Sequence, residues 1–191
     1  MRSDNLSRTQ QARRHDIIQA AIEIINSQGY AAASIMTIAK QAQTSKSTVL
    51  YHFASRDELI QAVIGSVYSD GAAYMKPRID AVATMKDKLH AYIVSNIEYL
   101  ALHTEQIAAV HQIVLNTPSA DYGADSVQRL EQLFVIGQAA GEFGKFDAKI
   151  MAVSLRHVID GASFYILRNP EIDIGTYAGS ISQMFKKATK K

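Results

Sequence analysis

The sequence contains no cysteine, no tryptophan and only 3 prolines among its 191 residues. Without cysteine the chain can form neither disulfide bonds nor thiolate metal sites, and this usage favours a reducing cytoplasm. Because proline interrupts helices, its scarcity leaves long segments free to be helical.

Long apolar runs are missing as well. The first residues, MRSDNLSRTQQARRHD, are polar, and Glu23 and Asn26 interrupt the first apolar segment. This pattern differs from that of a secretory signal peptide. No stretch resembles the run of ~18 uncharged apolar residues that is needed to cross a bilayer. We therefore expect a soluble cytoplasmic protein with no membrane partner.

Acidic residues are absent from one long segment, which runs from Ile24 to Arg56. Up to residue 56 the chain has seven basic and three acidic side chains, whereas the remainder has thirteen and fifteen. A basic N-terminal segment on a nearly neutral body suggests a polyanionic partner for that segment. A solvated basic surface explains the charge balance equally well, so charge alone does not decide between the two.

Apolar residues recur at helical spacing along the whole chain, and no segment alternates with the period of two that is typical of strands. Ser34 and Ser45 are suited to cap two short helices, and Ser55 with Glu58 has the spacing of a capping box for a long fourth helix that Lys76-Pro77 kinks or ends. The sequence therefore predicts an all-α protein of about nine helices. The six other helices are expected near residues 9–28, 86–102, 104–116, 124–140, 147–168 and 174–189.

The two short helices are separated only by the segment QAQTS, which leaves room for a sharp corner. Two short helices joined in this way form a helix-turn-helix, whose second helix enters the major groove of DNA. The second helix opens with Ser-Lys-Ser-Thr, so small hydrogen-bond donors and a positive charge lie at its N-terminus. Acidic residues there would be repelled by the phosphates. The missing acids and the small donors therefore have one common explanation, a surface that meets DNA.

The segment IINSQGYAAASIMTIAKQAQTSKSTVLYHFASRDELIQAVI resembles the N-terminal domain of TetR-type transcriptional repressors. The departures are Gln43 and Thr44 in place of the turn glycine and its following valine, Leu50 in place of a tyrosine that contacts the DNA backbone, and Arg56 in place of a lysine. The residues that match the family pattern are Gly29-Tyr30, Ile38-Ala39, Ser45, Thr48, His52-Phe53, Ser55 and Leu59.

The resemblance implies a helix-turn-helix DNA-binding domain over residues 1–55 and a helical ligand-binding and dimerisation domain over residues 56–191. At the DNA-binding surface we expect Lys46 and Arg56 to bind phosphates, and Leu50 either to pack internally or to touch a thymine methyl group. The DNA-binding residues that we predict are Thr37, Thr44, Ser45, Lys46, Ser47, Thr48, Tyr51, His52 and Arg56.

The resemblance further implies an effector pocket among the middle helices, where polar and aromatic side chains interrupt apolar faces. The residues expected to line it are Tyr92, Asn96, Tyr99, His103, His111, Gln112, Asn116, Phe134 and Phe164. In such repressors the last two helices pair with those of a second copy. The residues expected at that homodimer interface are Val153, His157, Gly161, Tyr165, Tyr177, Ile181 and Phe185.

The function that these observations predict is a regulator, most simply a repressor, that a small hydrophobic or aromatic effector releases from a palindromic operator in double-stranded DNA. A cationic effector is also compatible with the aromatic and acidic residues. We expect no cofactor, no metal and no catalysis. The rival readings are a helical small-molecule-binding protein without DNA binding, and a metal-dependent helical enzyme that would use His103, His111 or His157 with Asp121 or Asp160.

Overall fold

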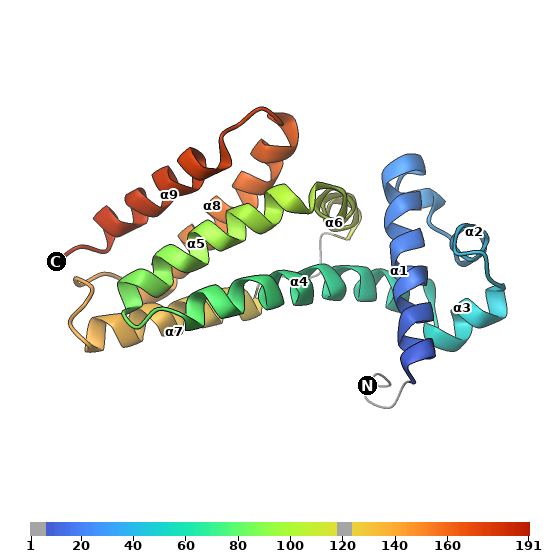
Figure 1. Ribbon diagram of the computed structural model, residues 1–191, viewed down its shortest axis with the longest axis horizontal. Helices are drawn as coiled ribbons and strands as arrows, with labels where there is room; N and C mark the ends of the chain where they lie inside the picture. Colours follow the sequence, from blue (N-terminus) through green and yellow to red (C-terminus); the bar gives the residue numbers. More distant parts are fainter. Residues whose placement is uncertain (1–6, 118–123) are drawn as a thin grey trace. The chain divides into compact units, whose positions relative to one another are not determined.

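The computed structural model describes residues 7–117 and 124–191, and in these residues it contains nine α-helices, one short 3-10 turn and no strand (Figure 1). The prediction of an all-α protein is confirmed. Asp121 lies outside the described residues. The helices are α1 (Arg8–Gln28), α2 (Ile35–Gln41), α3 (Lys46–His52), α4 (Arg56–Asp80), α5 (Met85–Leu102), α6 (Thr104–Asn116), α7 (Ala124–Ala139), α8 (Ala148–Arg168) and α9 (Ile174–Ala188), with the 3-10 turn at Tyr30–Ala32.

The described residues fall into two compact units. One unit holds the residues up to Ser69 together with those from Glu105 to residue 117, and the other holds Asp70–Thr104 and the residues from 124 onward. This division differs from the predicted domain boundary after residue 55 for two reasons. Helix α4 is continuous through residues 56–80, and α6 packs with the N-terminal helices, where the Asn26 amide donates to the Glu105 carbonyl over 2.9 Å.

In the N-terminal unit, side chains next to the helix starts cap α1 and α2 and stabilise them. Ser7 and Gln10 form a reciprocal capping box at the start of α1, and the Ser34 hydroxyl caps α2 by accepting from the Thr37 N–H over 3.1 Å. Gly29, with φ +87°, ends α1. The buried face of α1 comprises Ile17, Ile18, Ala20, Ala21, Ile22, Ile24 and Ile25.

The corner between α2 and α3 is closed by Gln43, whose φ of +49° makes it the one described non-glycine residue with a positive φ. The Thr44 N–H donates to the Ala39 carbonyl over 2.9 Å and the Gln43 N–H to the Lys40 carbonyl over 3.2 Å, which is the pattern of a Schellman motif. A side chain is strained in this backbone region, where glycine is not. The departure from the family's glycine therefore keeps the turn but costs stability.

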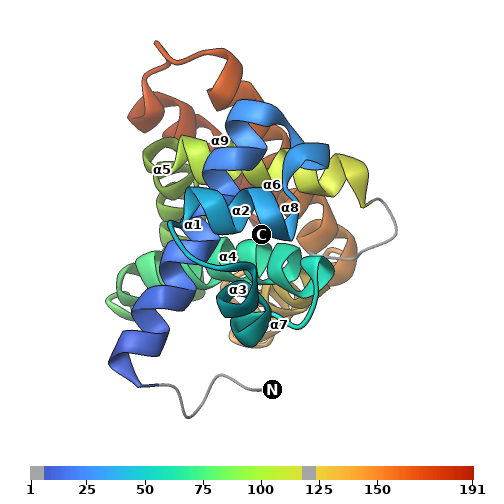
Figure 2. The ribbon, with the colours of Figure 1, turned by 90° about the vertical axis from the view of Figure 1, so that its right-hand side faces the viewer.

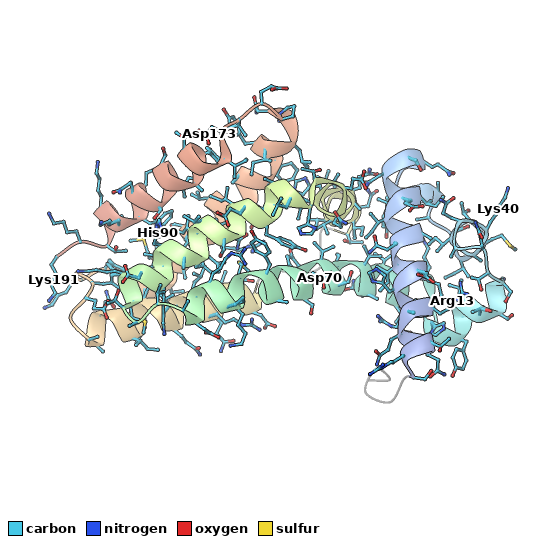
Figure 3. All side chains as sticks on the ribbon, in the orientation of Figure 1. Arg13, Lys40, Asp70, His90, Asp173 and Lys191 are labelled. Atoms are coloured by element: carbon cyan, nitrogen blue, oxygen red, sulfur yellow. The ribbon has the colours of Figure 1, made fainter. Side chains whose placement is uncertain are left out.

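The C-terminal unit packs α5 against α8 and α9 and α7 against α8 (Figure 1). His90 of α5, labelled in Figure 3, forms a hydrogen bond of 2.7 Å through Nδ1 with the Ser182 hydroxyl of α9. The loop before α8 is fixed by Phe143 and Phe146, whose rings lie 5.8 Å and 5.6 Å from that of Phe134. These aromatic contacts form part of the core of this unit.

Pro77 lies inside α4, which continues to Asp80, so the helix does not end at Lys76-Pro77 as the sequence suggested.

One helix of the described residues, α8, is long and apolar enough by length and composition to cross a membrane, with 33% of its most apolar window buried. This is weak evidence, because core helices of globular proteins meet the same criterion, and α8 carries an Arg156–Asp160 ion pair at its middle.

We predict that Gln43→Gly raises the free energy of unfolding by about 1 kcal/mol, since glycine removes the strain of a left-handed side chain. The matched control is Gln41→Gly, two residues earlier in helical backbone. It should lower the free energy of unfolding by about 1 kcal/mol, because glycine is a poor helix former, and it also removes the 2.6 Å bond to Glu23. Urea unfolding measures both changes, and an equal destabilisation by the two variants would contradict the assignment of strain to Gln43.

Candidate nucleic-acid interface

Helices α2 and α3 lie next to each other at the corner predicted as a helix-turn-helix, and both face the viewer in Figure 2. Val49 and Phe53, both 0% exposed, turn one side of α3 into the core. The opposite side of α3 carries Lys46, Ser47, Leu50 and Tyr51, all exposed. We call these four residues the outer ridge of α3.

The N-terminus of α3 is built from three hydroxyl groups. The Ser45 hydroxyl accepts from the Thr48 N–H over 3.0 Å and lies 2.8 Å from the hydroxyls of both Ser47 and Thr48. Ser45 therefore acts as the N-cap and also orients its two neighbours. No acidic side chain lies in the first turn of α3, and the capping hydroxyls are small and uncharged. The positive end of the helix dipole is therefore available to an anion.

Lys46 is the cation of the outer ridge. Its side chain is exposed, and within residues 7–117 and 124–191 it forms no ion pair. A lysine in this position can approach a phosphate without first breaking an internal contact. The predicted role of Lys46 as a phosphate ligand is compatible with its placement.

Tyr51 and His52 lie at the end of α3 beside the start of α1. Tyr51 is 63% exposed, and its hydroxyl accepts from the Gln10 amide over 2.9 Å. Nδ1 of His52 is buried and has no hydrogen-bond partner. Burial, together with the positive charges of Arg14 and Arg13, lowers the pKa of His52 below its usual range. At neutral pH the imidazole is therefore uncharged, with a nitrogen that lacks an internal partner.

Arg13 and Arg14 extend the positive surface from α3 onto α1. Arg13 is labelled in Figure 3, and Arg14 lies over the Phe53 ring with 4.6 Å between its guanidinium carbon and the ring centroid. Arg13 is 3.7 Å from Asp16, so its charge is partly compensated. The structure thus places Arg14 beside α3, as the basic start of the chain suggested, and adds Gln10, which the spacing of the motif did not indicate.

Arg56 is placed differently from the prediction. Its guanidinium donates to the Ala33 carbonyl over 2.7 Å and to the Tyr30 carbonyl over 2.8 Å, and it stacks on the Tyr30 ring at 4.3 Å. Its donors are committed to the segment before α2, so it positions the start of α4 rather than extending toward a phosphate. This difference from the prediction has a physical cause. Arginine offers five donors in a planar fork, so the side chain at position 56 can bond to two neighbouring carbonyls at once, which a solvated lysine would do less well.

The two remaining predicted DNA-binding residues are half-buried. Thr37 shares a 2.8 Å hydroxyl contact with Ser34 at the start of α2, and Thr44 lies in the turn. Both remain near the corner, with part of their surface accessible. The structure therefore gathers eight of the nine predicted residues around α3 and the corner, and it turns Arg56 inward.

The residues predicted to line an effector pocket divide between the two units. His111, Gln112 and Asn116 belong to the N-terminal unit, where the Asn116 amide donates to the Gln112 carbonyl over 2.8 Å. The other six belong to the C-terminal unit. The single predicted set is thus not assembled within one compact unit.

Within the C-terminal unit two small groups form. The Tyr92 hydroxyl bonds with Asn96 and with Arg156, and Arg156 also pairs with Asp160, so a half-buried polar network joins α5 to α8. Arg156 is not among the residues predicted to line the pocket, although its spacing of four residues from Asp160 indicates an ion pair on one helix face.

The second group is aromatic. The Tyr99 ring lies 4.3 Å from His103 and 5.8 Å from Tyr74, and Tyr74 donates to Glu98 over 3.3 Å. Burial and the charge of Asp70 raise the pKa of Tyr99 to about 12. The Tyr99 hydroxyl is therefore protonated at physiological pH, and the aromatic group lies beside the Glu98 carboxylate.

Phe134 lies outside both groups. Phe134 is fully buried among Phe143 and Phe146, and Phe164 is 39% exposed on α8. A shallow cavity of about 360 Å³ lies along α7, where it is lined by none of the predicted pocket residues. Its lining comprises Gln128, Glu131, Gln132, Val135 and Ile136.

The predicted dimer residues differ in exposure: some lie on the surface of the C-terminal unit and others are buried in its core. His157, Gly161 and Tyr165 are exposed along one side of α8, and a side chain at Gly161 would meet open space. The half-buried Val153 borders this side, and Tyr165 stacks on the half-buried Tyr177 with 5.3 Å between the rings. Ile181 and Phe185 are only 5% and 6% exposed.

Ile181 and Phe185 therefore need correction, because they fill the inner face of α9 where it packs on α5 (Figure 1). The exposed apolar residue of α9 is Met184, at 60%. Helical spacing alone identified an apolar face on α9 without showing which neighbour covers it.

No group of three or more His, Asp or Glu residues able to hold a metal ion occurs in the part of the chain that the structure describes. His103 instead stacks on Tyr99, and Asp160 pairs with Arg156. These residues are engaged in contacts unrelated to metal binding.

Known proteins resemble the chain most clearly at the interface described above. Residues 17–63 match the family model described as bacterial regulatory proteins, tetR family. The HTH-type transcriptional regulator BetI 1 of Chromohalobacter salexigens is 31% identical over 90 residues, which are 47% of this chain and 45% of that protein. The chain thus spans about half the length of the curated relatives that it matches.

Similarity in fold extends over nearly the whole chain. The transcriptional regulator FadR of Bacillus subtilis, solved in complex with stearoyl-CoA, has a TM-score of 0.76 and 20% identity, with 89% of this chain and 96% of that chain covered. AibR, solved in complex with isovaleryl coenzyme A and operator DNA, has a TM-score of 0.72 and 18% identity, with 90% and 97% covered. At these identities the likeness shows a shared fold.

The internal engagement of Arg56 leads to a stability prediction. Arg56→Gln should lower the free energy of unfolding by roughly 2–3 kcal/mol, because two part-buried carbonyls lose a charged donor. Lys46→Gln removes a charge of the same sign from an exposed site and should change stability by less than about 0.5 kcal/mol. Urea unfolding of the two variants distinguishes an internal clamp at Arg56 from a free cation, which would give equally small effects.

Proposed function

We propose that the chain is a ligand-responsive transcriptional regulator of the tetR family, acting as a repressor that binds a palindromic operator as a homodimer in the cytoplasm; the match of residues 17–63 to the family model supports this. The observation that carries the proposal is the outer ridge of α3. Ser47 and Tyr51 are exposed on it, Lys46 forms no ion pair with any residue that the structure describes, and the sequence has no acidic residue between Ile24 and Arg56. A buried ridge would have excluded the proposal.

The ridge supports DNA binding better than a function without DNA. A helical small-molecule-binding protein needs no acid-free segment and no short helix with an exposed cationic N-terminus. Both features are expected of a helix that enters the major groove, where phosphates line the approach. AibR, which shares the fold, is described in complex with operator DNA.

A homodimer is supported by the exposed side of α8. Ile150 is 62% exposed and Tyr165 47%, with His157 and the open position at Gly161 between them. Small and apolar residues along one side of a helix allow a second helix to approach closely. Two copies would place two α3 helices on successive turns of a palindromic site, roughly 34–36 Å apart.

The effector is proposed to be a small hydrophobic or aromatic compound that binds in the C-terminal unit, beside the Tyr74, Tyr99 and His103 rings. Acyl thioesters of coenzyme A are the first compounds to test, because FadR and AibR are described with stearoyl-CoA and isovaleryl coenzyme A. Helix α4 begins at Arg56 beside the helix-turn-helix and contributes Asp70 to Asp80 to the C-terminal unit. An effector that binds one position of α4 more tightly than another would shift the DNA affinity by that difference.

Lys46→Ala should weaken binding to DNA taken from upstream of the protein's own gene. The slope of log Kd against log salt concentration should fall by about one unit per protomer, because each lysine releases one condensed counterion. Lys145→Ala, an exposed lysine of the C-terminal unit, is the control and should leave both Kd and slope unchanged. Fluorescence anisotropy measures the binding, and acyl thioesters or aromatic compounds added to the same assay should release the DNA. Absence of binding by the wild type at low salt would reject the proposed function.

Gly161→Glu should convert the dimer to a monomer and abolish tight binding to a palindromic duplex, because it places a charge in the exposed side of α8. Gly65→Glu is the matched control, since Gly65 is also exposed in a helix with open space around it. Sedimentation velocity of both variants reports the oligomeric state. A dimer that tolerates Gly161→Glu would show that α8 does not form the interface.

A further inference from the structure

We propose that Leu50 is a specificity-determining residue that contacts the 5-methyl group of a thymine in each half of the operator. This inference rests on the proposed function, because it assumes that α3 enters the major groove. It goes further by naming the base feature that one side chain recognises and the chemistry of that contact.

The position of Leu50 on α3 is the first support. Its neighbour Val49 is 0% exposed, whereas Leu50 is 39% exposed. Leu50 follows Lys46 by four residues and Ser47 by three, so these side chains share one face of the helix. A helix that presents Lys46 and Ser47 to DNA therefore presents Leu50 to the same groove.

The chemistry of its neighbours is the second support. The Ser47 and Thr48 hydroxyls are each 2.8 Å from that of Ser45, and the Tyr51 hydroxyl is bonded to Gln10. The hydroxyl groups around Leu50 thus already have internal partners, which leaves the charge of Lys46 as the polar group available to a phosphate. Leu50 has no donor for a phosphate, and the single apolar group on the major-groove edges of the bases is the thymine methyl.

The expected size of the effect follows from the apolar area involved. Burial of one methyl group against Leu50 should change the affinity about three- to fivefold, which corresponds to roughly 0.8 kcal/mol. The effect is smaller than that of a bidentate hydrogen-bonded base contact, so it should alter the preferred base at one position without abolishing binding.

The first experiment selects duplexes from a randomised pool with the full-length protein. The wild type should enrich thymine at a fixed position in each half-site, and Leu50→Ala should lose that preference at this position alone. Two controls accompany it. Leu115→Ala removes an equally large exposed side chain (72% exposed) from α6, and Met36→Ala removes the exposed apolar residue of α2 (64% exposed). Both should retain the thymine. Loss of the preference in Met36→Ala but not in Leu50→Ala would overturn the proposal.

The second experiment replaces that thymine by deoxyuridine in the selected duplex, which removes the methyl group and keeps every hydrogen-bonding atom of the base. The wild type should bind about three- to fivefold more weakly, whereas Leu50→Ala should bind the two duplexes equally. Equal binding by the wild type, or the same loss in both proteins, would overturn the proposal. Thermal unfolding of Leu50→Ala verifies that the variant is folded.

The two experiments separate this inference from the proposed function. If the wild type enriches no sequence and Lys46→Ala changes no affinity, the proposed DNA-binding function itself is rejected, and the role of Leu50 with it. If the wild type enriches a palindrome whose affinity is indifferent to every thymine methyl, the regulator stands and the role of Leu50 is rejected.

Discussion

The Arg56 guanidinium holds together the part of the molecule on which the proposed function depends. It joins the first residue of α4 to the carbonyls of Tyr30 and Ala33 and stacks on the Tyr30 ring. These contacts fix the start of α4 to the chain that leads into α2. The corner that presents α3 is thereby connected to α4 by a charged side chain, while Val49 and Phe53 are buried in the core. A lysine, with a single point charge, would not satisfy two carbonyls and a ring in the same way.

Short-range hydrogen bonds also stabilise the N-terminal end of the outer ridge of α3. One hydroxyl, that of Ser45, caps the helix and holds Ser47 and Thr48, so three small residues form a preorganised N-terminus. Preorganisation lowers the entropic cost of binding, because the side chains are already confined. The ridge combines this polar end with the apolar Leu50, and such a mixture allows phosphates to set the position while base edges set the preference.

The C-terminal unit shows a different balance. Its core is ordinary, with Phe134, Phe143 and Phe146 in mutual contact, but α5 carries a polar network around Tyr92 and an aromatic group around Tyr99. Polar groups of this kind are costly inside a protein unless they are satisfied, and satisfied networks give a unique arrangement. Since α4 contributes Tyr74 to the aromatic group, an effector that rearranges these rings would act directly on the helix that begins at Arg56.

Local sequence was sufficient to predict the helices, the caps at Ser34 and Ser45, and the helix-turn-helix, because these features depend on residues only a few positions apart. The family resemblance further implied that Gln43 occupies a position that suits glycine, and its φ of +49° confirms this. Tertiary structure alone decided that Arg56 turns inward, that Ile181 and Phe185 are covered by α5, and that α6 belongs with the N-terminal helices. The physical reason is that helical spacing shows which residues share a face, whereas the identity of the neighbour on that face depends on chain segments far away in the sequence.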